Sequence, residues 1–112
     1  MTTDILDAGR VRALNDDLRR SFAGGTLMLT AGIIALGHER QLAILAAVAA
    51  FDRFDADNDP YGEGDFGALE AAGERVFFKI DYFDRTLARA SRDPSDPSVT
   101  ARVLTVMLAG EY

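Results

Sequence analysis

The stretch Phe66-Gly-Ala-Leu-Glu-Ala-Ala-Gly-Glu-Arg-Val-Phe-Phe-Lys-Ile-Asp-Tyr-Phe-Asp84 decides the fold. It contains two runs, 66–71 and 75–84, that are separated by Ala72-Gly73. Because successive side chains of a strand point to opposite faces, the alternation in the second run predicts a β-hairpin at the core of a sheet. The pattern places Val76, Phe78, Ile80 and Tyr82 on one face, and Phe77, Lys79, Asp81 and Phe83 on the other.

The residues before the hairpin predict two helices and one further strand. Apolar residues recur at helical spacing over 3–22, and Ala23-Gly24-Gly25 ends that helix. The alternating run 26–30 predicts a short strand. The alanine-rich run 38–54 predicts a second helix, which would pack closely on the sheet.

The residues after the hairpin predict a final helix. Asp96 precedes Pro97, and this pair favours a helix start because Asp caps free amides and Pro fits the first helical turn. We expect that helix to end at Ala109. The resulting order α-β-α-β-β-α predicts a single α+β domain over residues 1–112, with a small three-stranded, mainly antiparallel sheet and three helices on one face.

Composition excludes several classes of function. The chain of 112 residues has no cysteine, which excludes disulfides, thiolate zinc sites and cysteine nucleophiles. Its net charge of -6 is concentrated in residues 52–84, where acidic residues far outnumber basic ones, so binding of nucleic acid is disfavoured. The chain lacks an apolar run long enough to span a bilayer and starts without a secretion signal, so we expect no membrane contact and a cytoplasmic protein.

The acidic loop, residues 55–65, offers candidate metal ligands. Asp57, Asp59, Glu63 and Asp65 supply the oxygen ligands that Ca²⁺ or Mg²⁺ prefers. The loop departs from the calcium-binding EF-hand pattern, which has no place for Pro60 at its turn position. Two other interpretations stay open: the acids bond to their own backbone in Asx-type turns, or the loop docks a protein.

A second candidate constellation comes from the loop and the second hairpin strand. Its members would converge if the loop folded back over the hairpin, and they could then form an interface or do acid-base work. The alternative is a solvated salt bridge that catalyses nothing. The residues are Tyr61, Asp65, Lys79, Asp81 and Tyr82.

No residue set typical of catalysis stands out, so we predict no catalytic residue and no resident cofactor. His38 is the single histidine, and no serine lies in a nucleophile-elbow sequence. Arg85, Arg89 and Arg92 form a small basic cluster after the hairpin. That cluster either orients a partner or offsets neighbouring acids as ordinary surface charge.

Several short motifs resemble a bacterial family of unknown function, domain of unknown function 3768. They are Asn58-Asp-Pro-Tyr-Gly-Glu63, Asp65-Phe-Gly67, Gly73-Glu-Arg75, Phe78-Lys-Ile-Asp-Tyr82 and Val103-Leu-Thr-Val-Met-Leu108. The resemblance implies a bacterial or mobile-element accessory protein and brings no mechanism. Two positions depart from the family pattern, in which His often stands at Gly64 and Trp at Phe78, so a His-dependent activity is not expected here.

These observations predict a non-enzymatic module that binds another protein or regulates it. A specific loop beside an aromatic-rich strand suits an interface, whereas nucleophile-base sets are absent from the sequence. The alternative from another class is a divalent-metal-binding domain or small metal-dependent enzyme using the acidic loop. A further alternative is an acidic decoy that mimics DNA to defeat a host defence.

Overall fold

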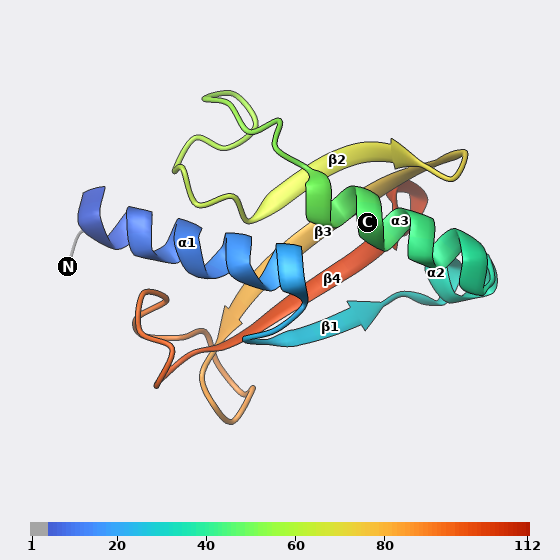
Figure 1. Cartoon of the computed structure of the whole chain (residues 1–112). Helices are drawn as coiled ribbons and strands as arrows, with labels where there is room; N and C mark the ends of the chain where they lie inside the picture. Colours follow the sequence, from blue (N-terminus) through green and yellow to red (C-terminus); the bar gives the residue numbers. More distant parts are fainter. Residues whose placement is uncertain (1–4) are drawn as a thin grey trace.

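The computed structural model describes residues 5–112 and shows an α+β domain with one four-stranded mixed sheet (Figure 1). The strand order is β1-β4-β3-β2, with β1 parallel to β4 and the other neighbours antiparallel. The elements are α1 (Ile5–Ser21), β1 (Thr26–Leu29), α2 (Ala31–Ala35), α3 (His38–Ala50), β2 (Phe66–Ala71), β3 (Glu74–Phe83), β4 (Ala101–Leu108) and the 3-10 helix η1 (Ala109–Glu111).

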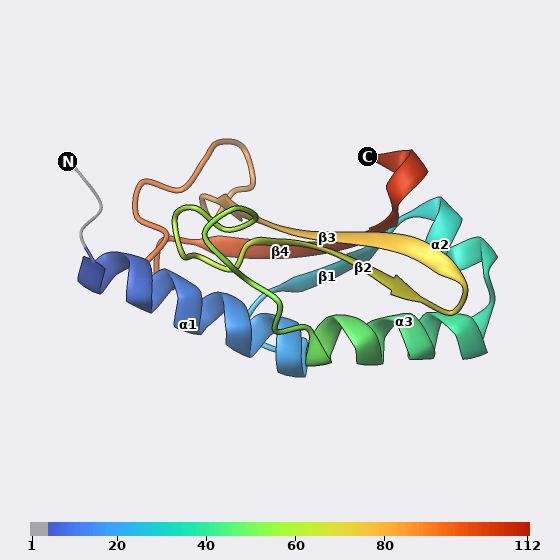
Figure 2. The same cartoon turned by 90° about the horizontal axis from the view of Figure 1, so that it is seen from above.

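The two long helices lie on one side of the sheet. Figure 2 shows α1 and α3 end to end across one face, whereas the short helix η1 stands at one end of the other face. The core forms between the sheet and these helices, where apolar side chains lose their contact with water. Its fully buried members are Leu18, Ile33, Ile44, Val48, Val76, Phe78, Leu104 and Val106.

The predicted hairpin is confirmed as β2 and β3. Ala72 and Gly73 turn the chain with positive φ angles of 53° and 76°. Gly67 pairs with Phe78 across the hairpin, and a Cβ atom on Gly67 would lie 2.3 Å from the Phe78 ring. Only glycine therefore leaves room for this ring, which also meets Phe51 edge to face at 5.3 Å between ring centroids.

The predicted C-terminal helix is wrong, because residues 101–108 form β4. This strand lies between β1 and β3 and turns the predicted three-stranded sheet into a four-stranded mixed one. Val103, Thr105 and Val106 are β-branched and suit a pleated strand better than a helix. Asp96 caps a turn instead of a helix, since its carboxylate accepts hydrogen bonds from the backbone and hydroxyl of Ser98 at 2.9 and 2.7 Å.

Two smaller differences concern the helices around residue 37. The short helix α2 was not predicted, and α3 ends at Ala50 instead of continuing to residue 54. Phe51 adopts an extended conformation, which carries Phe54 back over the core, where its ring lies 6.2 Å from that of Phe78. Packing of Phe51 and Phe54 against Phe78 stabilises the extended chain more than the helical propensity of these residues would stabilise a longer α3.

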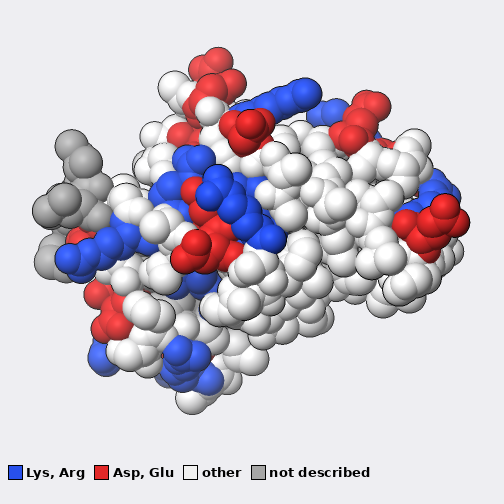
Figure 3. Space-filling model, viewed as in Figure 1, with Lys and Arg blue, Asp and Glu red and all other residues white. Residues whose placement is uncertain are grey.

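The helix side of the molecule is unevenly charged. Figure 3 shows acidic and basic side chains together over α1, whereas the surface over α3 and β1 carries few charges. No helix within the described residues is both long and apolar enough to cross a membrane.

Candidate functional site

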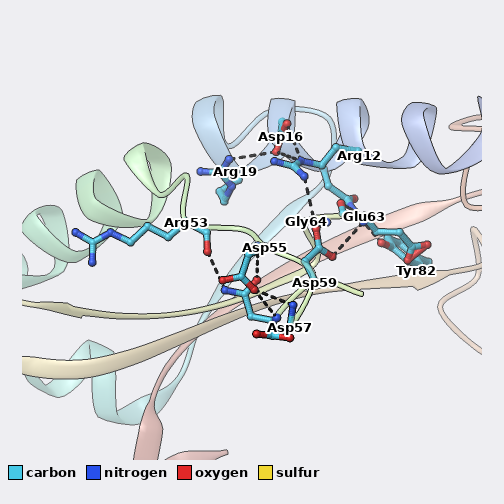
Figure 4. A network of polar contacts seen from close by, with 12 residues as sticks. Arg12, Asp16, Arg19, Arg53, Asp55, Asp57, Asp59, Glu63, Gly64 and Tyr82 are labelled. Carbon is cyan, nitrogen blue, oxygen red and sulfur yellow. Dashed lines mark hydrogen bonds and ion pairs between the residues drawn. The ribbon is translucent and has the colours of Figure 1, made fainter. Parts of the chain in front are cut away.

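The acidic loop is fastened to α1 by Asp59. This residue is only 8% exposed, and its carboxylate accepts hydrogen bonds from the backbone amides of Glu63 and Gly64 at 3.1 and 3.0 Å. Arg12 of α1 lies 3.5 Å from the same carboxylate (Figure 4). The bonds to the amides close a turn, as in the Asx-type interpretation, and the arginine compensates the charge of the buried carboxylate.

A second aspartate shapes the tip of the loop. The carboxylate of Asp55 accepts hydrogen bonds from the amides of Asp57 and Asn58 at 2.8 and 3.0 Å. The Asn58 side chain in turn donates to the Arg53 carbonyl at 2.8 Å. The loop is thus held by local side chain to backbone bonds.

A buried arginine ties α1 to the end of α3. Arg19 is fully buried and donates to the carbonyls of Val48 and Ala49, each at 3.0 Å. Its charge is balanced by Asp16 at 3.1 Å, and Asp16 also pairs with Arg12 (Figure 4). A cation at the last carbonyls of a helix is favourable, because these carbonyls form the negative end of the helix dipole.

Asn15 is the centre of the network and joins four parts of the chain. Its side-chain oxygen accepts a hydrogen bond from Nε of Arg102 at 2.9 Å. Its side-chain nitrogen donates to the Tyr82 hydroxyl at 2.7 Å and to the Glu63 carbonyl at 3.0 Å. Arg102 also donates to the Pro94 carbonyl. The polar core, as we call Asn15, Arg19, Tyr82 and Arg102, therefore links α1, the acidic loop, β3 and β4.

Burial shifts the pKa values of the ionisable groups in and beside the polar core. It raises the pKa of Glu63, and the charges of Asp65 and Asp59 raise it further. It also raises the pKa of Asp65, with smaller contributions from nearby carboxylates. Burial raises the pKa of Tyr82 and lowers that of Arg102, because it disfavours the charged form of each group.

The polar core nevertheless resembles a structural lock more than a reactive site. Among buried side-chain nitrogen and oxygen atoms of residues 5–112, only Nε of Arg19 lacks a hydrogen-bond partner. Buried polar groups that bond to one another stabilise the fold and hold the elements they join in one arrangement. The shifted pKa values follow from burial and need no catalytic explanation.

The proposed metal ligands do not form a group. No set of three or more His, Asp or Glu side chains within the described residues is arranged to hold a metal ion. Asp59 is committed to Arg12 and the loop amides, and the carboxylate of Asp57 points away from that of Asp59 (Figure 4). The geometry therefore gives no argument for the metal hypothesis, which stays a prediction.

The second predicted constellation is divided between the two sides of the sheet. Lys79 and Asp81 form an ion pair at 3.1 Å on the face opposite α1 and α3. Tyr82 lies on the opposite face, in the polar core. Tyr61 is 82% exposed in the acidic loop, and Asp65 is half-buried just before β2. Of the five, Lys79 and Asp81 form an ion pair, and the charge of Asp65 interacts with those of Asp81 and Tyr82.

The face opposite α1 and α3, here called the open face, carries an aromatic cluster that the sequence did not predict. The ring centroids of Phe66, Phe77 and Tyr112 lie 5.4 to 5.6 Å apart, and Tyr112 is 74% exposed. The register of the four strands places further side chains of the same face beside this cluster. The open face comprises Thr26, Met28, Phe66, Ala68, Glu70, Arg75, Phe77, Lys79, Asp81, Phe83, Ala101, Val103, Thr105, Met107 and Tyr112.

The polar core was also missed, although the sequence contained a signal for it. Asn15 and Arg19 are spaced with Val11 and Leu18 on one stripe of α1, so their burial follows from the helical period. Polar residues on an apolar stripe point to a buried network. Arg102 gave no comparable signal, because β4 itself was not predicted.

Fold and site together define a class: a small α+β domain whose mixed sheet is covered by helices on one face, locked by a buried polar core, and open on the other face. The family described as "Protein of unknown function (DUF3768)" matches residues 29–111, and the chain belongs to this family. The predicted resemblance is thereby confirmed. Neither the curated proteins nor the solved structures contain a match.

The two departures from the family pattern lie at crowded positions. Gly64 is buried with a φ of 63°, and a Cβ atom there would lie 2.8 Å from the Arg12 side chain. A histidine at this position would strain the loop and displace Arg12. Phe78 fills the core above Gly67, so the two positions serve packing in this chain.

Proposed function

We propose that this domain is a non-enzymatic protein-binding module and that the open face is its binding surface. One observation carries the proposal: one face of the sheet is covered by neither α1 nor α3 (Figure 2), yet most of its side chains are apolar or aromatic. An antiparallel sheet that meets only water normally alternates apolar residues inside with polar residues outside. On this face, polar residues of β3 are interleaved with Phe77 and Phe83.

The composition of the open face suits a protein partner. Its aromatic cluster offers large rigid contact area, the kind of surface that dominates the binding energy of protein interfaces. Its charged residues form two ion pairs: Lys79 with Asp81, whose side chains are 40% and 38% exposed, and Arg75 with Glu70 near the hairpin turn. Such a pair gives a docking surface orientation and specificity rather than affinity.

The polar core supports this role from the other side. It fixes α1, the acidic loop, β3 and β4 to one another, so the open face is presented on a rigid framework. A preorganised surface loses less conformational entropy when it binds. A regulatory or accessory role in a bacterial host or mobile element is consistent with such a module, and the partner is expected to be another protein.

Site-specific photo-crosslinking in living cells tests the proposal. A photoreactive amino acid is placed at Thr105 on the open face and, as a matched control, at Ala46, an exposed position of α3. We expect a discrete protein adduct from position 105 and none of the same size from position 46. Absence of any adduct at 105, or equal adducts at both positions, contradicts the proposal.

A further inference from the structure

A cavity of about 350 Å³ opens in the segment that joins β3 to β4. This segment, residues 84–100, leaves the sheet on the side opposite the helices (Figure 2). The cavity, here called the arginine pocket, is lined among others by Arg85, Arg89, Arg92, Ala90 and Val99. Its volume lies within the range of roughly 300–1,000 Å³ that is usual for small-molecule sites.

The acidic groups of this segment are engaged in turns. The Asp84 carboxylate accepts hydrogen bonds from the amides of Thr86 and Ala88, both at 3.1 Å, and from the Thr86 hydroxyl at 2.8 Å. Asp96 is bonded in the same way to Ser98, although its charge still interacts with Arg92 and Arg85. Asp84 is the one carboxylate among the residues known to line the pocket, against three guanidinium groups.

Two of the three arginines, Arg89 and Arg92, have N–H donors available for a ligand. Arg85 is held in place, because it donates to the carbonyls of Pro97 and Ser98. The side chains of Arg89 and Arg92 make no hydrogen bond or ion pair with the residues that the structure describes. A guanidinium group carries five N–H donors in a planar fork, and those of Arg89 and Arg92 face solvent around the cavity.

We propose that the arginine pocket binds a small phosphomonoester. The free donor forks of two arginines, Arg89 and Arg92, suit the three terminal oxygens and double negative charge of a phosphoryl group, whereas a single fork already satisfies the two oxygens of a carboxylate. Ala90 and Val99 provide apolar lining against which the carbon part of the ligand packs. The proposal goes beyond protein binding at the open face and depends on different residues.

The direct test is an NMR titration of the isotope-labelled chain at low ionic strength. The probes are phenyl phosphate, inorganic phosphate and benzoate, which separate the phosphoryl group, its carbon carrier and a plain carboxylate. Phenyl phosphate is expected to shift the amide signals of residues 84–92 and 98–99 in a saturable manner. It is expected to bind more tightly than either of the other two probes.

The decisive variant is Arg89→Ala combined with Arg92→Ala. Neither side chain bonds to the described part of the chain, so the fold is expected to be unaffected. Loss of two charge-assisted contacts is expected to weaken phenyl phosphate binding by at least about tenfold. Arg20→Ala removes an exposed arginine of α1 and serves as the control, with binding expected to be unchanged.

Three outcomes overturn the assignment. They are no saturable shift at millimolar phenyl phosphate, equal affinity of the double variant and the wild type, and binding of benzoate as tight as that of phenyl phosphate. Since the titration requires no protein partner, its failure leaves the proposed role of the open face standing. Failure of the crosslinking experiment likewise leaves the arginine pocket standing.

Discussion

The two faces of the same sheet are built differently. On the covered face, apolar side chains are fully buried by α1 and α3, and beside them a polar core has its hydrogen bonds nearly all satisfied. On the open face, the aromatic cluster and the Lys79–Asp81 pair stay accessible to solvent. The contrast separates two roles: side chains of the covered face stabilise the fold, and those of the open face are available to bind a partner.

Two neighbouring phenylalanines provide the largest test of this contrast. Phe78 is fully buried on the covered face, whereas Phe77 lies half-buried on the open face. Phe78→Ala is expected to lower the free energy of unfolding by about 3–5 kcal/mol, because it removes a core ring and leaves a cavity. Phe77→Ala is expected to cost less than about 2 kcal/mol. Urea unfolding of both variants measures the difference, and equal losses contradict the division of roles.

Removal of Asn15 is the next largest expected effect. Asn15→Ala leaves Nε of Arg102, the Tyr82 hydroxyl and the Glu63 carbonyl without their partner. We expect a loss of about 2–3 kcal/mol in the free energy of unfolding, the usual cost of stranding buried polar groups. Asp17→Ala, on the exposed side of the same helix, is the control and is expected to change stability by less than about 0.5 kcal/mol. An equal effect of the two changes contradicts the role of the polar core.

The raised pKa of Glu63 predicts a smaller, pH-dependent effect. Burial raises this pKa above the ordinary 4.5, so the folded state holds its proton more tightly than the unfolded state. Stability from this group is present at low pH and is lost as pH rises from about 4.5 through the raised pKa.

The variant Glu63→Gln removes that titration. It is expected to flatten the dependence of stability on pH just above pH 4.5 and to change stability at pH 7 by less than about 1 kcal/mol, since solvent screens a partly exposed group. Chemical unfolding across this pH range measures the slope. If the free energy of unfolding depends on pH equally in the wild type and in Glu63→Gln, Glu63 is not the group that causes this dependence.

Addition of Ca²⁺ or Mg²⁺ is expected to have no effect. A metal that binds only the folded state raises the melting temperature. In the acidic loop, the carboxylates of Asp55 and Asp59 already accept hydrogen bonds from backbone amides, and Arg12 forms an ion pair with Asp59. Thermal unfolding with each ion is the measurement. A rise in melting temperature that Asp57→Asn abolishes would instead establish the metal site predicted from the sequence.

The hairpin could be predicted from sequence because its signal is local. Alternation within β3 and the Ala72-Gly73 turn lie within a few residues of one another. β4 depends on pairing with β1 and β3, which are distant in the chain, and the Asp96-Pro97 pair suggested a helix that does not form. The β-branched residues of β4, Val103, Thr105 and Val106, favour a strand over a helix.

The candidate site was less predictable for the same reason. The Lys79–Asp81 contact follows from the strand period and could be foreseen. The aromatic cluster could not, because Tyr112 meets Phe66 and Phe77 only once η1 has folded back over the end of the sheet. Asp59, one of the candidate metal ligands, accepts hydrogen bonds from backbone amides, and no sequence pattern separates these two uses of an aspartate.

Exchange of the central ion pair tests the role of the open face most directly. The double variant Lys79→Glu with Asp81→Lys keeps an ion pair on the strand but reverses its direction. In the crosslinking experiment from Thr105, this variant is expected to lose the protein adduct while its urea unfolding midpoint stays close to that of the wild type. An adduct of undiminished yield from a normally folded double variant would contradict the open face as the binding surface.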